Sequence, residues 1–319
     1  MSVHSEQTVP WVLLAGPTAS GKTALAIELA LRIGGEIISA DSMQIYRGCA
    51  IGTAQPAAEE LHGVPCHLTG CLDPWQPWSV AEWLRAAKIC AAEIISRGRI
   101  PVVVGGTGLY FKTLTNGLFE TEGAAKHPEV RSRLEVEWDV DGGVALYERL
   151  RAVDVESTAR IHANDKLRVV RALEVFETTG RSISTLQAED RAQRKPLNAH
   201  RFVLCLDRDD LYHRIDARVE AMIAQGFEDE VRKLLDLGAL DEWPAMRALG
   251  YPQMLRMMRG EMDRASAVEE TQRFSRRYAK QQMVLYRRWW GAVWLDAAKG
   301  LTENARWIEK MLEFTASAA

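Results

Sequence analysis

The sequence of 319 residues is poor in cysteine and has no long apolar run. Its five cysteines are odd in number and form no CxxC pair, which favours reduced thiols and argues against a disulfide-stapled scaffold. No stretch approaches the roughly 20 apolar residues that a membrane span needs. Because residues 1–10 lack a basic start followed by an apolar block, we expect no secretory signal, no membrane contact and a cytoplasmic location.

The chain also lacks an excess of positive charge. Its net charge of −3 and isoelectric point of about 6.2 argue against a surface that attracts nucleic acid everywhere. Residues 271–288 are a local exception, with six basic side chains and no acidic one. This stretch is either a face that neutralises phosphates or a solvated amphipathic helix, and the sequence leaves both interpretations open.

Four residues of types that can bind a metal gather early in the chain, at His62, Cys66, His67 and Cys71. Their spacing matches no common zinc pattern, and Pro65 interrupts the group. We therefore expect no metal at this place.

Short apolar runs alternate with helical patterns in two parts of the chain. We expect strands at residues 11–15, 36–40, 100–104, 200–206 and 292–295, and helices at 23–32 and 80–96. Alternating strands and helices predict an α/β fold, in which a P-loop NTPase-like core has a parallel sheet flanked by helices and ligands bind at the carboxyl ends of its strands.

The pattern between these two parts is helical throughout. We therefore divide the chain into a first core part at 1–120, an all-helical insertion domain at 121–190, and a second core part at 191–319 with a helical carboxyl-terminal region.

A glycine-rich motif lies between the first expected strand and the first expected helix. It has the form GxxxxGK[ST] and consists of Gly16, Pro17, Thr18, Ala19, Ser20, Gly21, Lys22 and Thr23. Its glycines allow a tight turn, its amides and the helix N-terminus face phosphate oxygens, and the lysine adds charge. The Thr23 hydroxyl is placed to reach Mg²⁺. The motif predicts a polyphosphate ligand, not a particular reaction.

A single acidic residue, Asp41, ends an expected neighbouring strand. ATPases and GTPases of this class hold their metal with an acid at such a strand end. Asp41 is therefore a candidate metal ligand or general base, and the alternative is a turn cap, for which Asp is well suited.

Taken together, the motifs resemble the tRNA dimethylallyltransferase family, also called tRNA isopentenyltransferase. The resemblance spans nearly the whole chain and departs from the usual pattern at residues 65–67, where members often carry Pro-His-His. It rests on GPTASGKT at 16–23, ADSMQIYRG at 40–48, IGTA at 51–54, GGTGLYFK at 105–112, IHANDKLRVVRALEV at 161–175, RIDARVEAMIAQGFEDEV at 214–231 and RALGYPQM at 247–254.

The resemblance implies transfer of a dimethylallyl group from dimethylallyl diphosphate to N6 of the adenosine immediately 3′ of the anticodon in tRNA, with release of pyrophosphate. Mg²⁺ is the implied cofactor, and the phosphate loop holds the prenyl diphosphate. Asp41 is the implied base on the adenine amine, and Thr107 helps to place the adenine or the diphosphate.

The departing pyrophosphate also needs positive charge. Arg214 and Arg218 lie on one face of an expected helix, and family correspondence favours Arg218 as the catalytic arginine. The alternative for Arg218 is an exposed ion pair with Asp216 or Glu220.

The tRNA anticodon loop is the implied partner, and the target adenine must leave its stack to react. Arg168 and Arg171 have an alternative role in salt bridges with acids such as Glu174. The expected tRNA-binding residues are Asp41, Ser42, Met43, Gln44, Thr107, Arg131, Leu167, Arg168, Arg171, Arg247, Ala248, Leu249, Gly250, Tyr251 and Pro252.

Three other functions fit part of the sequence. An adenylate isopentenyltransferase shares the phosphate loop, but it does not require the helical insertion. A small-molecule kinase would consume ATP, and a non-enzymatic RNA-binding module would leave Asp41, Lys22 and Arg218 without a purpose. We expect a monomeric tRNA prenyltransferase.

Overall fold

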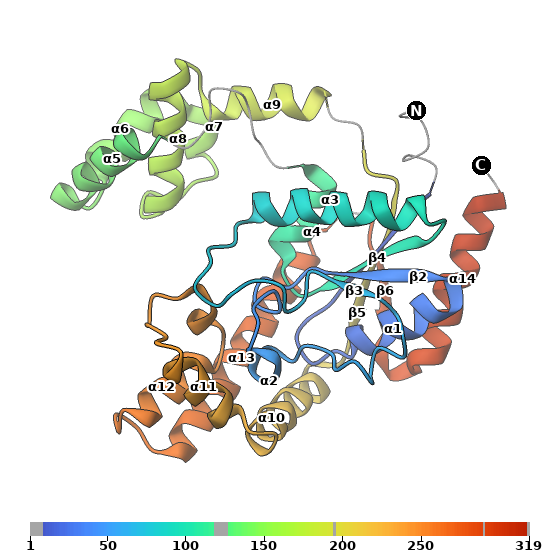
Figure 1. Ribbon diagram of the computed structural model, residues 1–319. Helices are drawn as coiled ribbons and strands as arrows, with labels where there is room; N and C mark the ends of the chain where they lie inside the picture. The colour runs from blue at the N-terminus through green and yellow to red at the C-terminus, as the bar shows by residue number, and fades with distance from the viewer. Residues whose placement is uncertain (1–8, 118–126, 194–195, 290, 318–319) are drawn as a thin grey trace. The chain divides into compact units, whose positions relative to one another are not determined.

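The computed structural model describes residues 9–117, 127–193, 196–289 and 291–317 (Figure 1). It divides into two compact units, the core unit (Met1–Thr115 with Leu197–Ala319) and the insertion unit (Asn116–Pro196). The domain boundary expected between 120 and 121 lies outside the described residues. The boundary expected between 190 and 191 falls inside helix α9 (Ile183–Gln193).

A six-stranded sheet forms the centre of the core unit, in the order β3-β2-β4-β1-β5-β6, and its paired strands are all parallel. The P-loop NTPase-like core predicted from the sequence is confirmed, with strand ends shifted by one residue or not at all. Cys66–His67 was not expected to be a strand. The strands are β1 (Trp11–Ala15), β2 (Gly35–Ser39), β3 (Cys66–His67), β4 (Ile100–Gly105), β5 (Ala199–Cys205) and β6 (Val293–Asp296).

Helices cover both faces of this sheet. Alternate side chains of β1, Val12 and Leu14, pack in one apolar cluster with α1 (Lys22–Ile33) and α14 (Leu301–Ser317). Helix α3 (Val80–Ser96) lies along the opposite face in Figure 1. It begins with a capping box, in which Ser79 and Glu82 satisfy backbone donors of the first turn.

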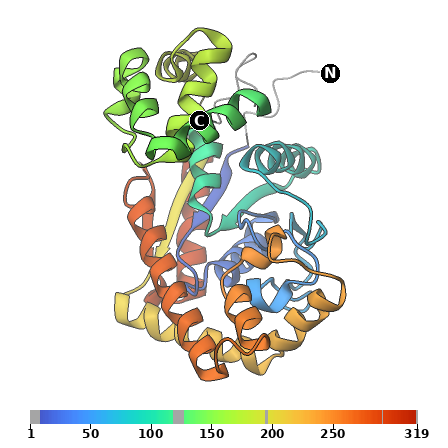
Figure 2. The ribbon, with the colours of Figure 1, turned by 90° about the vertical axis from the view of Figure 1, so that its left-hand side faces the viewer.

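A second layer of helices lies beside the carboxyl ends of the strands (Figure 2). Its apolar cluster includes Phe227, Met254 and Tyr251, whose ring meets that of Phe227 edge to face. The elements are α2 (Ala50–Thr53), α10 (Arg208–Ala224), α11 (Phe227–Asp236), η1 (Pro244–Arg247), α12 (Tyr251–Met258) and α13 (Arg264–Tyr286). This layer brings carboxyl-terminal residues to the strand ends of the amino-terminal half.

The described part of the insertion unit is helical. Leu134, Leu150 and Leu173 are buried at the centre of its own apolar cluster. Buried Asp154 accepts hydrogen bonds from the backbone N–H groups of Ser157 and Ser184. These two bonds connect the first turns of two helices. Its helices are α5 (Pro128–Asp141), α6 (Val144–Val153), α7 (Val155–Thr158), α8 (Lys166–Thr179) and α9.

Two short elements complete the fold, α4 (Gly108–Asn116) after β4 and η2 (Ala297–Lys299) after β6. Within the described residues, no helix has both the length and the apolar character that crossing a membrane requires.

Candidate active site

The phosphate loop, residues 16–23, leaves the carboxyl end of β1. Strand β1 lies between β4 and β5, so the connections of the sheet diverge on either side of it. Ligands of open α/β sheets bind at such a point, outside the carboxyl ends of the strands. The fold therefore puts the phosphate loop where a ligand is expected.

The backbone of the phosphate loop is shaped for an anion. Ala19 and Gly21 have positive φ angles of 62° and 87°, which turns successive amides toward a common concavity. Gly21 precedes α1 and provides no side-chain cap. The first N–H groups of this helix are therefore left available to an anion at the helix N-terminus. A side chain at Gly16 would come within 2.8 Å of the Leu204 carbonyl oxygen, so this position admits only glycine without rearrangement.

Lys22 curls back over this loop. Its Nζ donates a hydrogen bond to the Pro17 carbonyl oxygen at 3.1 Å. Burial and the positive charge of Arg218 together lower the pKa of Lys22 to about 8, although the negative charge of Asp41 opposes the shift. The three side chains therefore share one electrostatic environment.

Asp41 follows β2 in a short turn, the Asp41 loop (residues 40–44). Its Oδ1 accepts hydrogen bonds from the N–H groups of Met43 at 2.9 Å and Gln44 at 3.4 Å. Thr107 supports this loop, because its Oγ1 accepts from the N–H of Ser42 at 3.0 Å and its own N–H donates to Ala40 at 3.1 Å. Asp41 thus caps the turn, as the alternative interpretation held, and also faces the pocket described below.

Arg218 reaches the phosphate loop from α10. Its Nη1 donates a hydrogen bond to Oγ1 of Thr18 at 3.0 Å. The alternative ion pair with Asp216 is wrong, because that carboxylate pairs with Arg276. Arg214, one helical turn earlier, is exposed.

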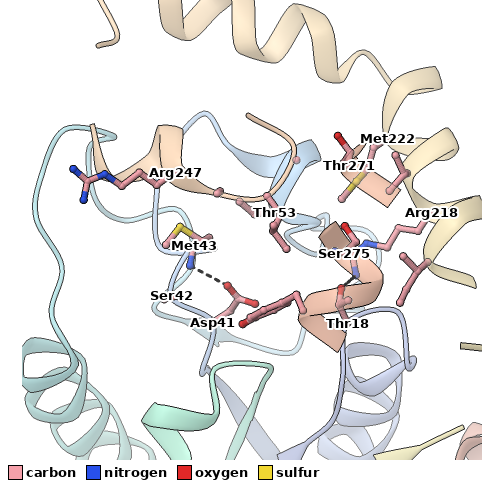
Figure 3. A pocket seen from close by; sticks show the side chains of 16 residues that line it. Thr18, Asp41, Ser42, Met43, Thr53, Arg218, Met222, Arg247, Thr271 and Ser275 are labelled. Atoms are coloured by element: carbon pink, nitrogen blue, oxygen red, sulfur yellow. Dashed lines mark hydrogen bonds between the residues drawn. The ribbon is translucent and has the colours of Figure 1, made fainter. Parts of the chain in front are cut away.

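A pocket of about 220 Å³ separates Asp41 from Arg218. Figure 3 shows Arg218 extending toward Thr18 on one side and the Asp41 carboxylate on the other. The wall beside Arg218 is aliphatic and comes from Ile215, Val219 and Met222. The pocket therefore combines a charged end that suits a diphosphate with an apolar wall that suits a hydrocarbon chain.

A smaller cavity of about 20 Å³ lies behind the phosphate loop. Lys22, Thr23 and Asp41 line it together. A hydroxyl and a carboxylate are hard oxygen ligands of the kind that Mg²⁺ prefers, so the residues present fit that ion.

Helix α13 contributes three pocket residues that the sequence analysis did not assign to the site, Thr271, Ser275 and Tyr278. Burial raises the pKa of Tyr278, and the charge of Asp41 raises it further. The wall between the Asp41 loop and α10 also includes Gly52 and Thr53 of α2. The IGTA and basic segments were visible in the sequence, but only the fold shows that they meet.

Some of the expected tRNA-binding residues lie at this pocket. Ser42, Met43, Arg247, Ala248 and Leu249 line it, and the Arg247 guanidinium points away from Asp41 in Figure 3.

Other residues of the same group face elsewhere. Gly250 is buried, and Pro252 is exposed. The Tyr251 side chain is completely buried and donates its hydroxyl proton to Glu230 at 2.7 Å, so a side-chain contact with RNA is not available here. Gln44 uses its side-chain amide on the carbonyl oxygens of Thr53 and Ala54. Its role is to hold the loop.

The remaining tRNA-binding candidates belong to the insertion unit. Leu167 is 70% exposed, and exposed Arg168 pairs with Asp165. Arg171 pairs with Glu174 at 3.0 Å, as the salt-bridge alternative expected. Arg131 pairs with Glu135 at 3.1 Å.

Two other sequence features have local partners. His67 pairs with Glu36 at 2.7 Å, and the Cys66 thiol lies 3.4 Å from the Thr69 hydroxyl. In the basic stretch, Arg273 pairs with Glu270 and Arg276 with Asp216, so part of its charge is neutralised within the protein.

Comparison with known proteins is consistent with this geometry. The family model described as IPP transferase matches residues 44–289, and the one described as isopentenyl transferase matches residues 10–66. The tRNA dimethylallyltransferase of Syntrophobacter fumaroxidans is 48% identical over 290 residues, which is 91% of this chain and 84% of that protein. The tRNA dimethylallyltransferase of Geobacter sulfurreducens is 43% identical over 285 residues, 89% of this chain and 91% of that protein.

Solved structures agree with the sequence comparison. The full-length tRNA isopentenylpyrophosphate transferase from Bacillus halodurans is similar with a TM-score of 0.72 and 36% identity, over 97% of this chain and 98% of that one. A eukaryotic dimethylallyltransferase described as acting on tRNA has a TM-score of 0.78 and 26% identity, over 91% of this chain and 74% of that one. The chain therefore belongs to the IPP transferase family, as its motifs predicted.

Proposed function

We propose that this chain is a tRNA dimethylallyltransferase, which transfers a dimethylallyl group from dimethylallyl diphosphate to N6 of the adenosine immediately 3′ of the anticodon. The observation that carries the proposal is one pocket lined by Thr18 of the phosphate loop, by Asp41 and by Arg218, with an aliphatic wall beside them. The relatives, which are named for dimethylallyl transfer to tRNA, support the same reaction.

In the proposed reaction the bond between the prenyl carbon and the diphosphate oxygen breaks, and a bond forms from that carbon to N6. The adenine amine is a poor nucleophile while it keeps its protons, so a base must accept one as the new bond forms. Asp41 is suited to this role, since its carboxylate faces the pocket and the neighbouring amides hold it in place.

The leaving pyrophosphate takes the electron pair of the broken bond and gains negative charge. Donors aimed at that charge lower the barrier more than donors aimed at the ground state. Lys22, Arg218 and the amides of the phosphate loop beyond Thr18, whose own N–H donates to Gln282, are the proposed donors. Mg²⁺, held by Thr23 and the diphosphate, would supply further positive charge when bound.

The adenine reaches this pocket after leaving the anticodon-loop stack, which costs on the order of a few kcal/mol for an unpaired base. Arg247 at the pocket, together with Arg131, Arg168 and Arg171 of the insertion unit, is proposed to hold the flanking nucleotides. We also propose that one chain suffices for catalysis and that it acts in the cytoplasm, where its tRNA substrate is found.

The direct test offers two acceptors. The protein is incubated with Mg²⁺ and dimethylallyl diphosphate, together with either tRNA or AMP, and the mass of each acceptor is measured. The proposal expects one added prenyl unit on tRNA and none on AMP. Prenylated AMP with unchanged tRNA would instead identify an adenylate isopentenyltransferase. A parallel incubation with labelled ATP tests the kinase alternative, which expects ATP to be consumed without prenyl transfer.

A further inference from the structure

Gln282 of α13 connects two loops of the active site. Its side chain is only 5% exposed, and both ends of its amide are used. Oε1 accepts a hydrogen bond from the N–H of Thr18 at 2.9 Å, and Nε2 donates one to the Gly106 carbonyl oxygen at 2.8 Å. A single side chain thus holds the loop after β1 against the loop after β4.

The second of these loops is shaped to receive this side chain. A Cβ atom at Gly106 would lie 2.4 Å from Nε2 of Gln282, and no other heavy atom would lie closer than 3.6 Å. The Tyr286 hydroxyl donates to the same Gly106 carbonyl oxygen at 2.8 Å. Two side chains of α13 therefore converge on one carbonyl, and a Cβ at residue 106 would force the Gln282 amide to move.

The connection continues to the Asp41 loop. Thr107 follows Gly106 and accepts the N–H of Ser42 at 3.0 Å. Tyr278 of α13 lines the pocket together with Asp41 and Ser42. A continuous path thus runs from Thr18 through Gln282, Gly106 and Thr107 to Ala40 and Ser42, the residues on either side of Asp41.

We propose that Gln282 is a positioning residue that fixes the distance between the phosphate loop and the Asp41 loop. The inference rests on the proposed function, in which the diphosphate lies on one loop and the adenine amine meets the base on the other. Gln282 acts through the loops and touches neither reacting atom. Its loss should therefore lower the rate of the bound complex more than the affinity for tRNA.

The first test removes both hydrogen bonds and keeps the volume. Gln282→Met is compared with Gln281→Met, since Gln281 is the exposed neighbour of the same type on the same helix. At saturating tRNA and dimethylallyl diphosphate we expect Gln282→Met to lower kcat by about 10-fold to 100-fold, the scale of a misplacement near 1 Å. Gln281→Met should stay within about twofold, and tRNA affinity should change little in both variants.

A double-mutant cycle between residues 106 and 282 keeps the inference testable if Gln282→Met folds poorly. Gly106→Ala should lower kcat because its new methyl group collides with the Gln282 amide. Gln282→Ala removes the colliding atoms, so adding Gly106→Ala to it should cost almost nothing further. The two changes are therefore expected to be strongly non-additive, as for residues in direct contact.

Two results would overturn the inference. One is a folded Gln282→Met protein whose kcat at saturation equals that of the unchanged protein. The other is a Gly106→Ala protein with full activity, or one whose loss simply adds to that of Gln282→Ala. The unchanged protein serves as the reference. If it yields no prenylated tRNA, the proposed function is wrong, and the inference about Gln282 falls with it.

Discussion

The Arg218 guanidinium donates a hydrogen bond to the Thr18 hydroxyl at 3.0 Å, which joins α10 to the phosphate loop. Burial lowers the pKa of Arg218, and the charge of Asp41 opposes that shift. A partly buried cation beside a phosphate-binding backbone is suited to stabilise the charge of a leaving diphosphate. The contact therefore connects the fold of the carboxyl-terminal half with the chemistry of the amino-terminal motif.

Replacing Arg218 tests this role. We expect Arg218→Ala to lower single-turnover prenyl transfer by about 100-fold or more, the usual loss when one donor to a developing charge is removed. Arg218→Lys should recover only part of the rate, because a lysine lacks the planar fork of donors. Arg214→Ala, on the exposed turn before it, is the matched control and should remain active. Equal rates for Arg218→Ala and Arg214→Ala would remove Arg218 from the mechanism.

Asp41→Asn separates the two roles of Asp41. An asparagine oxygen still accepts the hydrogen bond from the Met43 N–H, but the amide cannot take a proton. Prenyl transfer should fall by about 100-fold to 10,000-fold, the range for loss of a general base, while tRNA affinity stays nearly unchanged. Filter binding measures the tRNA affinity, and a single-turnover assay measures prenyl transfer. If Asp41→Asn is fully active and Asp41→Ala is not, Asp41 is only a turn cap.

The depressed pKa of Lys22 predicts a pH dependence. Because that pKa lies at about 8 in the free protein, the ammonium is charged below this pH and loses its proton above it. The kcat/KM for dimethylallyl diphosphate should therefore decline as the pH rises through about 8, whereas an unshifted lysine would keep its charge to about 10. Lys22→Arg stays charged throughout and should lack this alkaline decline. A decline at the same pH in Lys22→Arg would assign it to another group.

Glu230 predicts an effect on stability. This buried carboxylate accepts hydrogen bonds from the N–H groups of Ile51 and Gly52 and from the Tyr251 hydroxyl. Glu230→Ala leaves these donors unsatisfied, so the free energy of unfolding should fall by on the order of 3 kcal/mol. Urea denaturation measures it, with exposed Asp229→Ala expected to change little. Similar midpoints for the two variants would show that Glu230 does not hold α2 in place.

Strands β1 and β4 could be predicted because each is a short, almost fully buried apolar run that is followed by glycine. Strand β3 could not, since it has two residues and pairs with β2 only through Ile37 and Ile38. Such a short edge strand produces no periodicity. In the sequence Cys66 and His67 were considered only as metal ligands, an interpretation that their spacing argued against. Their partners Thr69 and Glu36 became visible only in the fold.

The site was predictable where one segment contains its own chemistry, as in the phosphate loop. Arg218 was assigned through family correspondence, because residue spacing says nothing about its contact with Thr18, 200 positions away. Gln282 was not identified, although the pair Gly105-Gly106 offered a signal. Adjacent glycines at a strand end often mark a close approach of another group, but the sequence does not name that group.

In the proposed reaction the adenosine next to the anticodon receives the prenyl group. Two tRNA transcripts that differ only there, one with adenosine and one with guanosine, are incubated with the protein, Mg²⁺ and labelled dimethylallyl diphosphate. We expect label in the adenosine transcript alone, on the fragment that contains that nucleotide. Equal labelling of both transcripts, or no labelling of either, would contradict it.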